Sequence, residues 1–545
     1  MDLTNPTEVL SKTLKKKGFR VSTTTTTTTS NPSLTIISCD AVVVGSGSGG
    51  GVVAGVLAKA GHKVIVLEKG DYYPKSSLSL LEGPTLDNMY DGSCFMATDD
   101  LGVIVLAAST VGGGSTINWS ASLRTPDHVL DEWRNVHGLH DLFGISNSAY
   151  ERALEAVCER MGVQSGVDEE GLNNAVLRSG CERLGYPVKH VPRNAPLDHY
   201  CGWCHLGCKG GRKKGTAETW LADMAESGNG VIFPRCEALR VMHEKGGIKG
   251  RRATGVVFKS FDSRRTTTTV LVESKVTVVA CGALRTPGLL KRSGLKNKHI
   301  GRNLRLHPVV MAWGFFPSKK KKSYEGGIIT SMSTVVSNFE TTGYGAVIQM
   351  PSLHPGMFSV LTPWLSGADF KDRMTRFAGT AHLFALARDG GEGGAVDLTR
   401  GTMAYKMDGR DEESLQRGLE EMLRILAAAG AEEIGTQHRM GKRLLNVTKA
   451  GEEELERFVR EASGRGLRDW SAPICSAHQM GSCRMGVEPE RSAVDQRGET
   501  WEVEGLFVGD ASVLPTALGV NPMVTVQAIA YCTAQSLLEF LERKT

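Results

Sequence analysis

The pattern of hydrophobic and polar residues is clearest from Cys39 to Gly70, where it predicts two strands joined by a helix. CDAVVV is a β-branched run, a glycine-rich turn follows it, and VVAGVLAKA has the small, apolar residues of a buried helix. A second apolar run, VIVLEKG, contains the acidic residue Glu68 at its end. Strand, tight turn, helix and strand in this order predict a βαβ unit.

Two later segments repeat this pattern. In VTVVACGALRTPGLLKRSG an apolar strand ends at small residues, and we expect a helix to open near Thr286 and Pro287. In GLFVGDAS a further apolar strand closes at Asp510, which can also cap the turn that follows it. Together the three segments predict a doubly wound, Rossmann-like α/β domain assembled from separate pieces of the chain.

The middle of the chain predicts a second domain. RLHPVVMAWGFF is strand-like, and AHLFALARDGGEGGAVDLTRGTMAYKM has the pattern strand, glycine turn, strand. EESLQRGLEEMLRILAAAG then has apolar residues at helical spacing. We therefore expect an α+β cap domain, built on an antiparallel sheet, that forms the substrate cavity.

Two long uncharged stretches, residues 41–58 and 101–123, are candidates for membrane spans. Gly, Ser or Asn interrupts each of them where a spanning helix would place Leu, Ile and Phe, so we expect neither to cross a membrane. The first twenty residues lack the apolar core of a signal peptide, and seven threonines follow from Thr23 to Thr29. We expect this N-terminal segment to be disordered.

Composition narrows the class of protein further. A chain of 545 residues exceeds the length at which one core stops growing, which indicates two or more domains. Lys and Arg number 64 against 59 Asp and Glu, and this near balance argues against a nucleic-acid partner. Twelve cysteines without a secretory signal favour reduced thiols and an intracellular protein.

The glycine-rich turn carries the first candidate site. Gly45, Gly47 and Gly50 fit the pattern GxGxxG, in which glycines allow the tight turn, the close approach of a pyrophosphate and the packing of helix on strand. Glu68 lies 18 residues after Gly50, where a carboxylate can accept ribose hydroxyls. The pattern predicts a dinucleotide site, and it leaves NAD and FAD open because both contain the same ADP half. The alternative is a turn in which the glycines serve packing alone.

Three segments resemble the signature stretches of the glucose-methanol-choline (GMC) oxidoreductases, in the same order and spacing. They are TVGGGSTIN, GALRTPGLLKRSGL, and SAHQMGSCRMG with GLFVGDASVLPTALGVNPMVTVQAIA. Within that family, LKNKHIGRNLRLHPVVMAWGFFP, KSYEGGIITS, and HQMGSCRMG with GVNPMVTVQ are most similar to the plant and fungal long-chain fatty alcohol oxidases. The resemblance runs from about residue 10 to the C-terminus. Plant members also carry a longer N-terminal region with membrane-associated apolar segments, and this sequence departs from them there.

The resemblance implies FAD as the cofactor and the oxidation of a long-chain alcohol by O2 as the reaction, with aldehyde and H2O2 as products. It also implies an enzyme of lipid degradation and ω-oxidation that associates with a membrane surface. The family's flavin loop would correspond to Gly113, Gly114 and Asn118, and the last segment would place Asp510, Ala511 and Pro522 at FAD. A neutral amide such as that of Asn118 can reach the edge of a ring.

The resemblance also assigns the chemistry to two side chains. Oxidation of an alcohol requires the loss of a hydroxyl proton, and histidine can accept a proton near neutral pH. The family's base corresponds to His478, and its partner position corresponds to Asn521, whose amide can hold the alcohol oxygen. Without the resemblance, a lone histidine is more often structural. His307 lies in a strand-like run away from the signature segments, and we expect it to be structural.

A cysteine-rich stretch, CGWCHLGC at residues 201–208, leaves several interpretations open. Cys201, Cys204, Cys208 and His205 have ligand types and spacing that could hold zinc or a cluster, with Cys236 as a further candidate. Structural thiols or a local disulfide are the other interpretation. We favour this second interpretation, so the predicted site includes no metal. The lysine clusters at residues 15–17 and 319–322 indicate solvated loops or contact with anionic lipid.

The sequence thus predicts the following division of the chain: 1–36, a disordered segment; 37–125 and 216–300, two parts of the FAD domain; 126–215, a helical insertion with the cysteine-rich loop; 301–470, the cap domain; and 471–545, a C-terminal segment with catalytic and FAD-binding residues. Three alternative functions stay open. They are a dehydrogenase of the same family that uses a quinone, a light-driven fatty-acid decarboxylase, and a non-catalytic flavin- or metal-binding protein that uses CGWCHLGC. The His478 and Asn521 pair argues against the decarboxylase, which needs no alcohol base.

Overall fold

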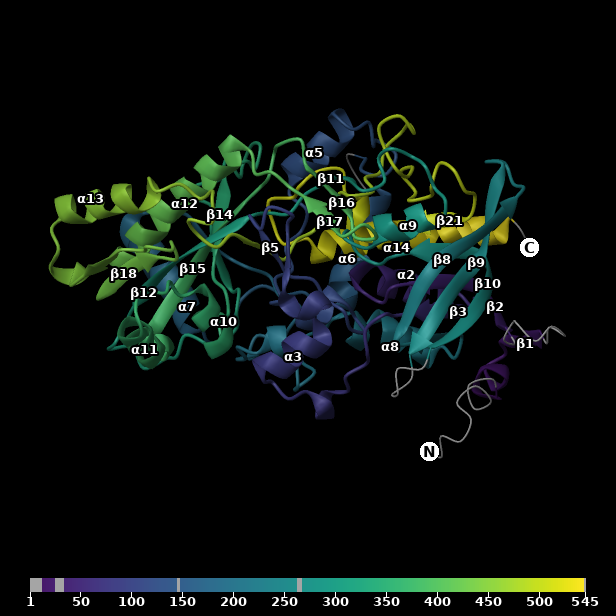
Figure 1. The fold of residues 1–545 in the computed structure, drawn as a ribbon, viewed down its shortest axis with the longest axis horizontal. Helices are drawn as coiled ribbons and strands as arrows, with labels where there is room; N and C mark the ends of the chain where they lie inside the picture. Colours follow the sequence, from purple (N-terminus) through teal and green to yellow (C-terminus); the bar gives the residue numbers. More distant parts are fainter. Residues whose placement is uncertain (1–11, 25–33, 145–147, 262–266, 544–545) are drawn as a thin grey trace.

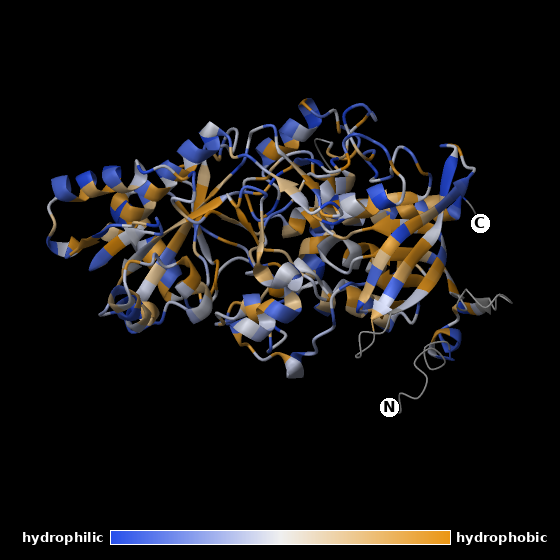
Figure 2. Cartoon of the chain, viewed as in Figure 1, coloured by the Kyte–Doolittle hydropathy of each residue, from blue (hydrophilic) through white to orange (hydrophobic). Residues whose placement is uncertain are grey.

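The protein is described from a computed structural model, which covers residues 12–24, 34–144, 148–261 and 267–543. Two sheets lie at opposite ends of an elongated molecule, and the chain passes between them several times (Figure 1). The strands of both sheets are mostly hydrophobic, whereas the outer helices present hydrophilic residues (Figure 2). Each sheet therefore forms its own buried core.

The first sheet has eight strands in the order β7-β3-β2-β10-β9-β8, with β1 paired to β2 and β21 paired to β10. Neighbouring strands among β7, β3, β2, β10 and β21 run parallel, as a doubly wound fold requires. The strands of this sheet are β1 (Arg20–Thr24), β2 (Leu34–Val44), β3 (Val64–Leu67), β7 (Gly230–Phe233), β8 (Cys236–Lys245), β9 (Arg251–Phe261), β10 (Thr267–Val279) and β21 (Leu506–Val508).

Strand β10 joins three distant parts of the chain. Its first half pairs antiparallel with β9, from Thr267 to Glu273. Its last residues, Thr277 to Val279, pair parallel with β21, while almost its whole length pairs with β2. The β-branched residues of β10 suit a strand, and its last four residues, from Val276 to Val279, are buried on both faces. The C-terminal segment is thereby bound directly beside the glycine-rich turn that follows β2.

Helices of small residues cover this sheet. Helix α2 (Ser48–Lys59) begins at the glycine-rich turn and packs against α8 (Trp220–Glu226) and α14 (Met523–Glu542), and α14 also packs on α6 (Ala149–Arg160). A Cβ atom on Gly55 would lie 2.6 Å from the carbonyl oxygen of Trp220. Glycine in this helix therefore allows α8 to approach closely.

The second sheet has ten strands in the order β4-β5-β20-β12-β15-β14-β13-β6, with β18 paired to β12 and to β19. It is mainly antiparallel. Its strands are β4 (Met96–Ala97), β5 (Ile104–Val105), β6 (Val188–His190), β12 (Val309–Phe315), β13 (Ser331–Ser333), β14 (Ala346–Gln349), β15 (Thr380–Ala387), β18 (Glu433–Thr436), β19 (Arg443–Leu445) and β20 (Cys475–Ser476). A smaller sheet contains β11 (Arg302–Leu304), β16 (Gly394–Asp397) and β17 (Thr402–Ala404).

Helix α12 (Gly409–Ala428) lies on one face of β12 and β15. A Cβ atom on Gly418 would lie 2.4 Å from the Cβ of Ala385, which shows which face of β15 meets the helix. Because side chains alternate along a strand, Phe384 and Leu386 point to the opposite face. Their partners across the ladder, Met311 and Val309, share that face and leave it free to form a cavity wall.

The remaining helices connect these sheets. They are α3 (Glu82–Met89), α4 (Gly114–Ile117), α5 (Asp127–Asn135), α7 (Leu172–Leu184), α9 (Thr286–Arg292), α10 (Pro355–Leu361), α11 (Gly367–Arg376) and α13 (Glu452–Ser463), with 3-10 turns η1 (Lys75–Ser77), η2 (Asp91–Cys94), η3 (Cys204–Leu206), η4 (Thr216–Glu218), η5 (Phe377–Gly379), η6 (Val447–Lys449) and η7 (Ala511–Val513).

Several expectations from the sequence are confirmed. Helix α9 opens at Thr286 with Pro287 in its first turn, and the periodic segment forms α12. Asp510 caps η7, because its side chain accepts a hydrogen bond from the backbone N–H of Ser512. In the part of the chain that is described, no helix is long and apolar enough to cross a membrane.

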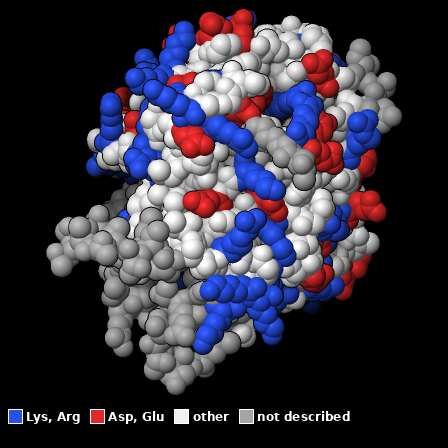
Figure 3. All heavy atoms as spheres, turned by 90° about the vertical axis from the view of Figure 1, so that its right-hand side faces the viewer, with Lys and Arg blue, Asp and Glu red and all other residues white. Residues whose placement is uncertain are grey.

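On the face at the right-hand end of Figure 1, acidic and basic side chains are interspersed (Figure 3).

One expectation is corrected. The N-terminal segment is not disordered throughout, because residues 12–16 are helical and Arg20–Thr24 pair with β2. Residues 1–11 and 25–33 of that segment lie outside the described residues. The predicted pattern of strand, glycine turn and strand is confirmed by β15 and β16, and these two strands belong to different sheets, since β15 lies in the ten-stranded sheet and β16 pairs with β11 and β17. The glycines of that turn carry the chain from one sheet to the other.

Candidate active site

Four segments meet at the carboxyl ends of the parallel strands of the first sheet. The turn at Gly45 follows β2, Glu68 follows β3, Gly282 follows β10 and Asp510 follows β21. This is where open α/β sheets bind their ligands. A cavity of about 420 Å³ begins at these segments and extends to the ten-stranded sheet. Its volume lies in the usual range of small-molecule and cofactor sites.

The structure places nearly all of the predicted site residues in the wall of this one cavity. They are Gly45, Gly47, Glu68, Gly113, Gly114, Asn118, His478, Asp510, Ala511, Asn521 and Pro522. Gly50 is the exception, because it lies within α2 beneath the turn. A Cβ atom on Gly50 would lie 2.0 Å from the carbonyl oxygen of Gly45, so its role is to let the helix pack on the turn.

The turn after β2 requires glycine for its own geometry. Gly45 has a φ of 104°, and a Cβ atom on it would lie 2.2 Å from the carbonyl oxygen of Ala280. Ser48 and Gly49, in the first turn of α2, also line the cavity. The backbone N–H groups at a helix N-terminus favour an anion, so the first turn of α2 fits a pyrophosphate.

Two buried carboxylates form hydrogen bonds that fix the cavity wall at the carboxyl ends of the parallel strands, which we call the nucleotide end of the cavity. Glu68 accepts hydrogen bonds from the backbone N–H and the hydroxyl of Ser46, at 3.0 and 2.6 Å, and from the backbone N–H of Gly70 at 2.8 Å. Asp510 accepts from the backbone N–H of Gly282 at 2.9 Å and from the hydroxyl of Thr286 at 2.5 Å. Burial raises the pKa of both carboxyl groups. Asp510 thus links the ends of β10 and β21.

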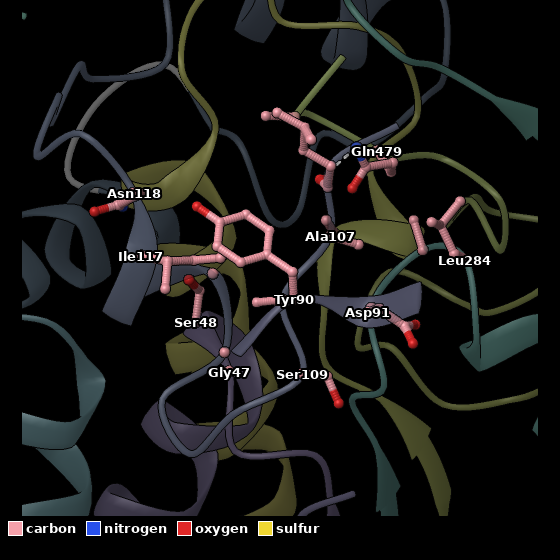
Figure 4. A pocket seen from close by; sticks show the side chains of 18 of the residues that line it. Gly47, Ser48, Tyr90, Asp91, Ala107, Ser109, Ile117, Asn118, Leu284 and Gln479 are labelled. Atoms are coloured by element: carbon pink, nitrogen blue, oxygen red, sulfur yellow. Dashed lines mark hydrogen bonds between the residues drawn. The ribbon is translucent and has the colours of Figure 1, made fainter. Parts of the chain in front are cut away.

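A charged cluster that the sequence patterns did not indicate lies at the same end. Asp91 accepts from Nζ of Lys69 at 2.7 Å and from the guanidinium of Arg285 at 2.8 Å, and the two cations lower the pKa of Asp91 despite its burial. Figure 4 shows Asp91 beside Tyr90, whose ring lies in the view between Ile117 on one side and Ala107 on the other. All three charged side chains line the cavity.

The loop of the second candidate motif closes over the glycine-rich turn. Gly113 has a φ of 52°, and a Cβ atom on it would lie 2.6 Å from the Cα of Gly47. Asn118 ends the short helix α4, and its amide donates to the sulfur of Met523 at 2.9 Å. Two backbone segments, Gly47 and Gly113, therefore touch without side chains between them. Such an exposed backbone suits a flat, bulky ring.

Lys213 supports this loop from behind, and no sequence signal distinguished it from the neighbouring Lys214. The side chain is 1% exposed. Its ammonium donates to the backbone carbonyls of Thr116 and Asn118, at 2.9 and 2.8 Å, and to that of Cys204 at 3.3 Å. A buried ammonium with three acceptors holds the loop in one conformation.

His478 lies on the opposite wall, after the short strand β20 that pairs with β5 and β12. Its ring packs edge-on against His307, with Nδ1 of one ring 3.2 Å from Nδ1 of the other. Burial and the neighbouring His307 lower the pKa of His478 to about 3, so its ring is neutral at pH 7. A neutral imidazole can accept a proton.

His307, which we expected to be structural, is fully buried and holds backbone groups, but its contact with His478 had no signal in the sequence. The chain turns sharply at His307, which has a φ of 50°, immediately before β12. Nε2 of His307 accepts hydrogen bonds from the backbone N–H groups of Leu518 and Gly519, at 3.1 and 3.0 Å. The hydrogen of this neutral ring must then lie on Nδ1, where it points at His478. In this arrangement neutral His478 accepts at Nδ1 and carries its own hydrogen on Nε2.

Asn521 reaches the cavity from the first sheet, just before α14. Its amide nitrogen lies 3.4 Å from Nε2 of His478, and its oxygen accepts from the amide of Gln349 at 2.9 Å. Gln349 is fully buried in β14. No pattern in the sequence singled out Gln349, because its role arises from a contact between two sheets. The arrangement brings His478 and Asn521 together with their polar groups directed at the same space.

Apolar side chains form the wall beside this pair. They come from β12, β15 and the segment that contains α10, and they are Val309, Met311, Phe384, Leu386, Leu353, Met357 and Leu361. Those from β12 and β15 stand on the face of the ten-stranded sheet that is opposite α12. The cavity is therefore polar at its nucleotide end and apolar beyond His478.

The cysteine-rich stretch lies behind the loop that contains Gly113 and Asn118. Cys201, Cys204 and Cys208 are free thiols, so the local disulfide is not present. Within the described part of the chain, no group of three or more His, Cys, Asp and Glu side chains could hold a metal ion. The metal interpretation of this stretch is therefore not supported.

Comparisons with known proteins agree with this geometry. Two family models described as GMC oxidoreductase match residues 86–309 and 395–530. The chain belongs to the GMC oxidoreductase family.

Among proteins of this family, the chain is 59% identical to long-chain-alcohol oxidase FAO4A of Arabidopsis thaliana, over all of this chain and 75% of that protein. It is 48% identical to long-chain-alcohol oxidase FAO3 of the same plant, over 91% of this chain and 67% of that protein.

Solved structures of related fold include pyridoxine 4-oxidase from Mesorbium loti, with a TM-score of 0.65 and 19% identity over 91% of this chain and 99% of that one. Formate oxidase from Aspergillus oryzae RIB40 gives a TM-score of 0.67 with 13% identity, over 93% of this chain and 99% of that one. GMC oxidoreductases are flavoproteins that bind FAD. The cavity fits FAD, because the first turn of α2 suits its pyrophosphate and Gly114, where a Cβ atom would meet nothing within 4 Å, leaves space for its ring.

Replacement of Gly113 by alanine tests this fit. The new Cβ would clash with Gly47 in a left-handed backbone, and strain of about 1–3 kcal/mol should weaken FAD binding roughly tenfold or more. The flavin absorbance per protein measures the loss. The matched control is Gly61→Ala, because Gly61 has a φ of 96° but no atom within 4 Å of the position that a Cβ would take. Equal FAD content in the two variants would contradict the assignment.

Proposed function

We propose that this enzyme oxidises long-chain fatty alcohols to aldehydes, with FAD as its cofactor and O2 as the final acceptor, and that it releases H2O2. The observation that carries this proposal is the apolar wall beside His478 and Asn521, which suits an alkyl chain whose hydroxyl lies at the two polar side chains. The similarity to two long-chain-alcohol oxidases supports the same substrate class.

FAD, when bound, supplies the acceptor for the hydride that leaves the alcohol carbon. Residues of three segments would hold it: Gly45, Gly47 and Glu68 from the first βαβ unit, Gly113, Gly114 and Asn118 from the flavin loop, and Asp510, Ala511 and Pro522 from the C-terminal segment. The carboxylate of Glu68 makes three hydrogen bonds to the protein and retains acceptor capacity for a ribose hydroxyl.

In this proposal His478 handles the hydroxyl proton of the alcohol. The Nε2–H of the neutral ring first donates to the alcohol oxygen and so orients it. To accept the proton at Nε2, the ring must carry its hydrogen on Nδ1, a form that the hydrogen bond from His307 opposes. The proposal therefore requires the contact between His307 and His478 to open before the proton is transferred.

Asn521 positions the alcohol in this scheme. An amide can donate to the alcohol oxygen and does not compete for its proton at neutral pH. The hydrogen bond from Gln349 fixes the orientation of the Asn521 amide from behind. The apolar wall holds the alkyl chain and excludes water from the reacting carbon.

Replacement of His478 by alanine tests the assignment of the base. We expect kcat to fall by about 100- to 10,000-fold with dodecanol, because the group that handles the proton is lost, while bound flavin is retained. Steady-state oxygen consumption and the visible spectrum measure the two quantities. His140→Ala is the control, since His140 is exposed and should be replaceable without effect. Full activity of the His478 variant would overturn the assignment.

The pH dependence tests the same residue. The pKa of His478 is lowered to about 3, so the neutral form that can accept a proton is present at all higher pH values. We therefore expect the acid limb of kcat/KM to lie well below about pH 6.5, where an unperturbed histidine titrates. If the acid limb of kcat/KM lies at about pH 6.5 and shifts when His478 is replaced, the result would contradict the buried environment of this residue.

We also propose that the enzyme takes its alcohol from a lipid surface. Helices α3 and α10 contact each other, because the carboxylate of Glu82 accepts from the backbone N–H groups of Gly356 and Met357. Both helices contribute to the cavity wall, and apolar side chains near them are exposed to solvent. These side chains are Leu81, Val360 and Trp364, with exposed fractions of 62%, 70% and 66%. An exposed apolar edge beside an apolar cavity suits entry of a lipid.

Flotation with phosphatidylcholine vesicles tests this surface. The double variant Val360→Asp, Trp364→Asp should bind to vesicles more weakly than the parent protein, because two apolar side chains at the edge become charged. Ile248→Asp is the control, since Ile248 is 93% exposed on the turn between β8 and β9. If the parent protein does not float, or if the control loses binding equally, this part of the proposal fails.

A further inference from the structure

We propose that Cys201 and Cys204 form a redox site that hydrogen peroxide converts into a disulfide. The source of peroxide in the cell would be the enzyme's own turnover, so this step rests on the proposed function. The site itself rests on four structural features: the spacing of the two thiols, the buried ammonium of Lys213, the unpaired ring of His205 and the connection to the flavin loop.

The two thiols are placed for bond formation. Cys204 opens the 3-10 turn η3, and Cys201 precedes it by one tight bend. The two side chains are close enough to shift each other's pKa, and both are free thiols in the structure. A Cys-x-x-Cys pair of this kind can form a disulfide with little movement of the backbone.

The surroundings of Cys204 favour its thiolate. Lys213 is fully buried and donates to three backbone carbonyls, including that of Cys204 itself. It makes no ion pair with an acidic side chain among the described residues. The hydroxyl of Ser120 lies 3.7 Å from the sulfur of Cys204. The hydrogen bond from Cys201 and the charge of Lys213 lower the pKa of Cys204 to about 5, and the same hydrogen bond raises the pKa of Cys201.

The next residue along η3 connects this site to the cavity. His205 is 5% exposed and lines the cavity, yet neither of its ring nitrogens has a hydrogen-bond partner among the described residues. Burial lowers the pKa of His205 to about 3, so the neutral ring offers one donor and one acceptor. Hydrogen peroxide likewise can both donate and accept hydrogen bonds. His205 therefore provides a binding position for peroxide between the cavity and Cys204.

Hydrogen peroxide is the only oxidant that the formation of this disulfide requires. The thiolate of Cys204 attacks one peroxide oxygen, the O–O bond breaks, and a sulfenic acid and hydroxide form. The thiol of Cys201 then attacks the sulfur of the sulfenic acid and gives its proton to the departing hydroxyl, so that the disulfide and water result. The first hydroxide takes up the proton that Cys204 released when it ionised. In total, two thiols are oxidised to a disulfide and one peroxide is reduced to two molecules of water.

Lys213 connects this site to the cofactor loop. The same ammonium that lies near Cys204 holds the carbonyls of Thr116 and Asn118 in that loop. Conversion of the thiolate to a neutral disulfide removes the negative charge beside Lys213. The redox state of the two cysteines therefore alters the electrostatic environment of the group that supports the flavin loop.

The experiment uses the reduced holoenzyme and one equivalent of hydrogen peroxide added without alcohol. After denaturation, free thiols are labelled with N-ethylmaleimide, and the peptide that contains residues 201–208 is examined by mass spectrometry. We expect Cys201 and Cys204 to escape labelling together, with the loss of two hydrogen atoms, while Cys208 is labelled. Cys201→Ser should leave a sulfenic acid on Cys204 that dimedone traps, and Cys208→Ser should form the disulfide as the parent does.

Two results would overturn the proposal. One is that Cys201 and Cys204 remain labelled under peroxide that oxidises other thiols of the protein, and the other is that the disulfide forms through Cys208. A second arm replaces added peroxide by turnover with dodecanol in air, with and without catalase. If added peroxide forms the disulfide and turnover does not, the redox site stands and the enzyme's own turnover is not its source of peroxide.

Discussion

The pairing of β21 with the end of β10 is the interaction on which the site depends. Only three residues of each strand pair, yet they bring the C-terminal segment beside the glycine-rich turn that follows β2. Asp510 then binds both Gly282 and Thr286, so the ends of the two strands are fixed by a buried carboxylate as well as by the ladder. Helix α14 leaves this point and packs on α2, and Asn521 is held at its start.

The two side chains that we propose to act on the alcohol come from two different sheets. His478 follows a strand at the edge of the ten-stranded sheet, whereas Asn521 belongs to the segment that the first sheet holds. Their nitrogens lie 3.4 Å apart. Gln349 and His307, which lie on the side of the second sheet, help to hold this arrangement because both bind the C-terminal segment. The proposed catalytic pair therefore lies at the junction between the sheets, and any change that shifts one sheet against the other separates the two side chains.

The first βαβ unit, α9, α12 and the strand before Asp510 were predictable from local sequence patterns, because strand alternation and helical spacing depend on neighbouring residues. The contact of His307 with His478 could not be predicted, because it follows from a backbone turn with positive φ and from two N–H groups more than 200 residues away. Lys213 and Gln349 had no signal, since single polar residues acquire their roles only in long-range packing. Hydrophobic patterns likewise identified β15 and β16 but not their partner strands.

The most direct test of this account is the visible spectrum of the purified protein during anaerobic addition of dodecanol. If the apolar wall delivers a long-chain alcohol to His478 and Asn521 beside FAD, the flavin bands should bleach with dodecanol, much less with ethanol, and return in air with the formation of one peroxide per aldehyde. A flavin spectrum that dodecanol leaves unchanged would contradict the account, and recovery with a quinone but not with air would contradict the assignment of O2 as the acceptor.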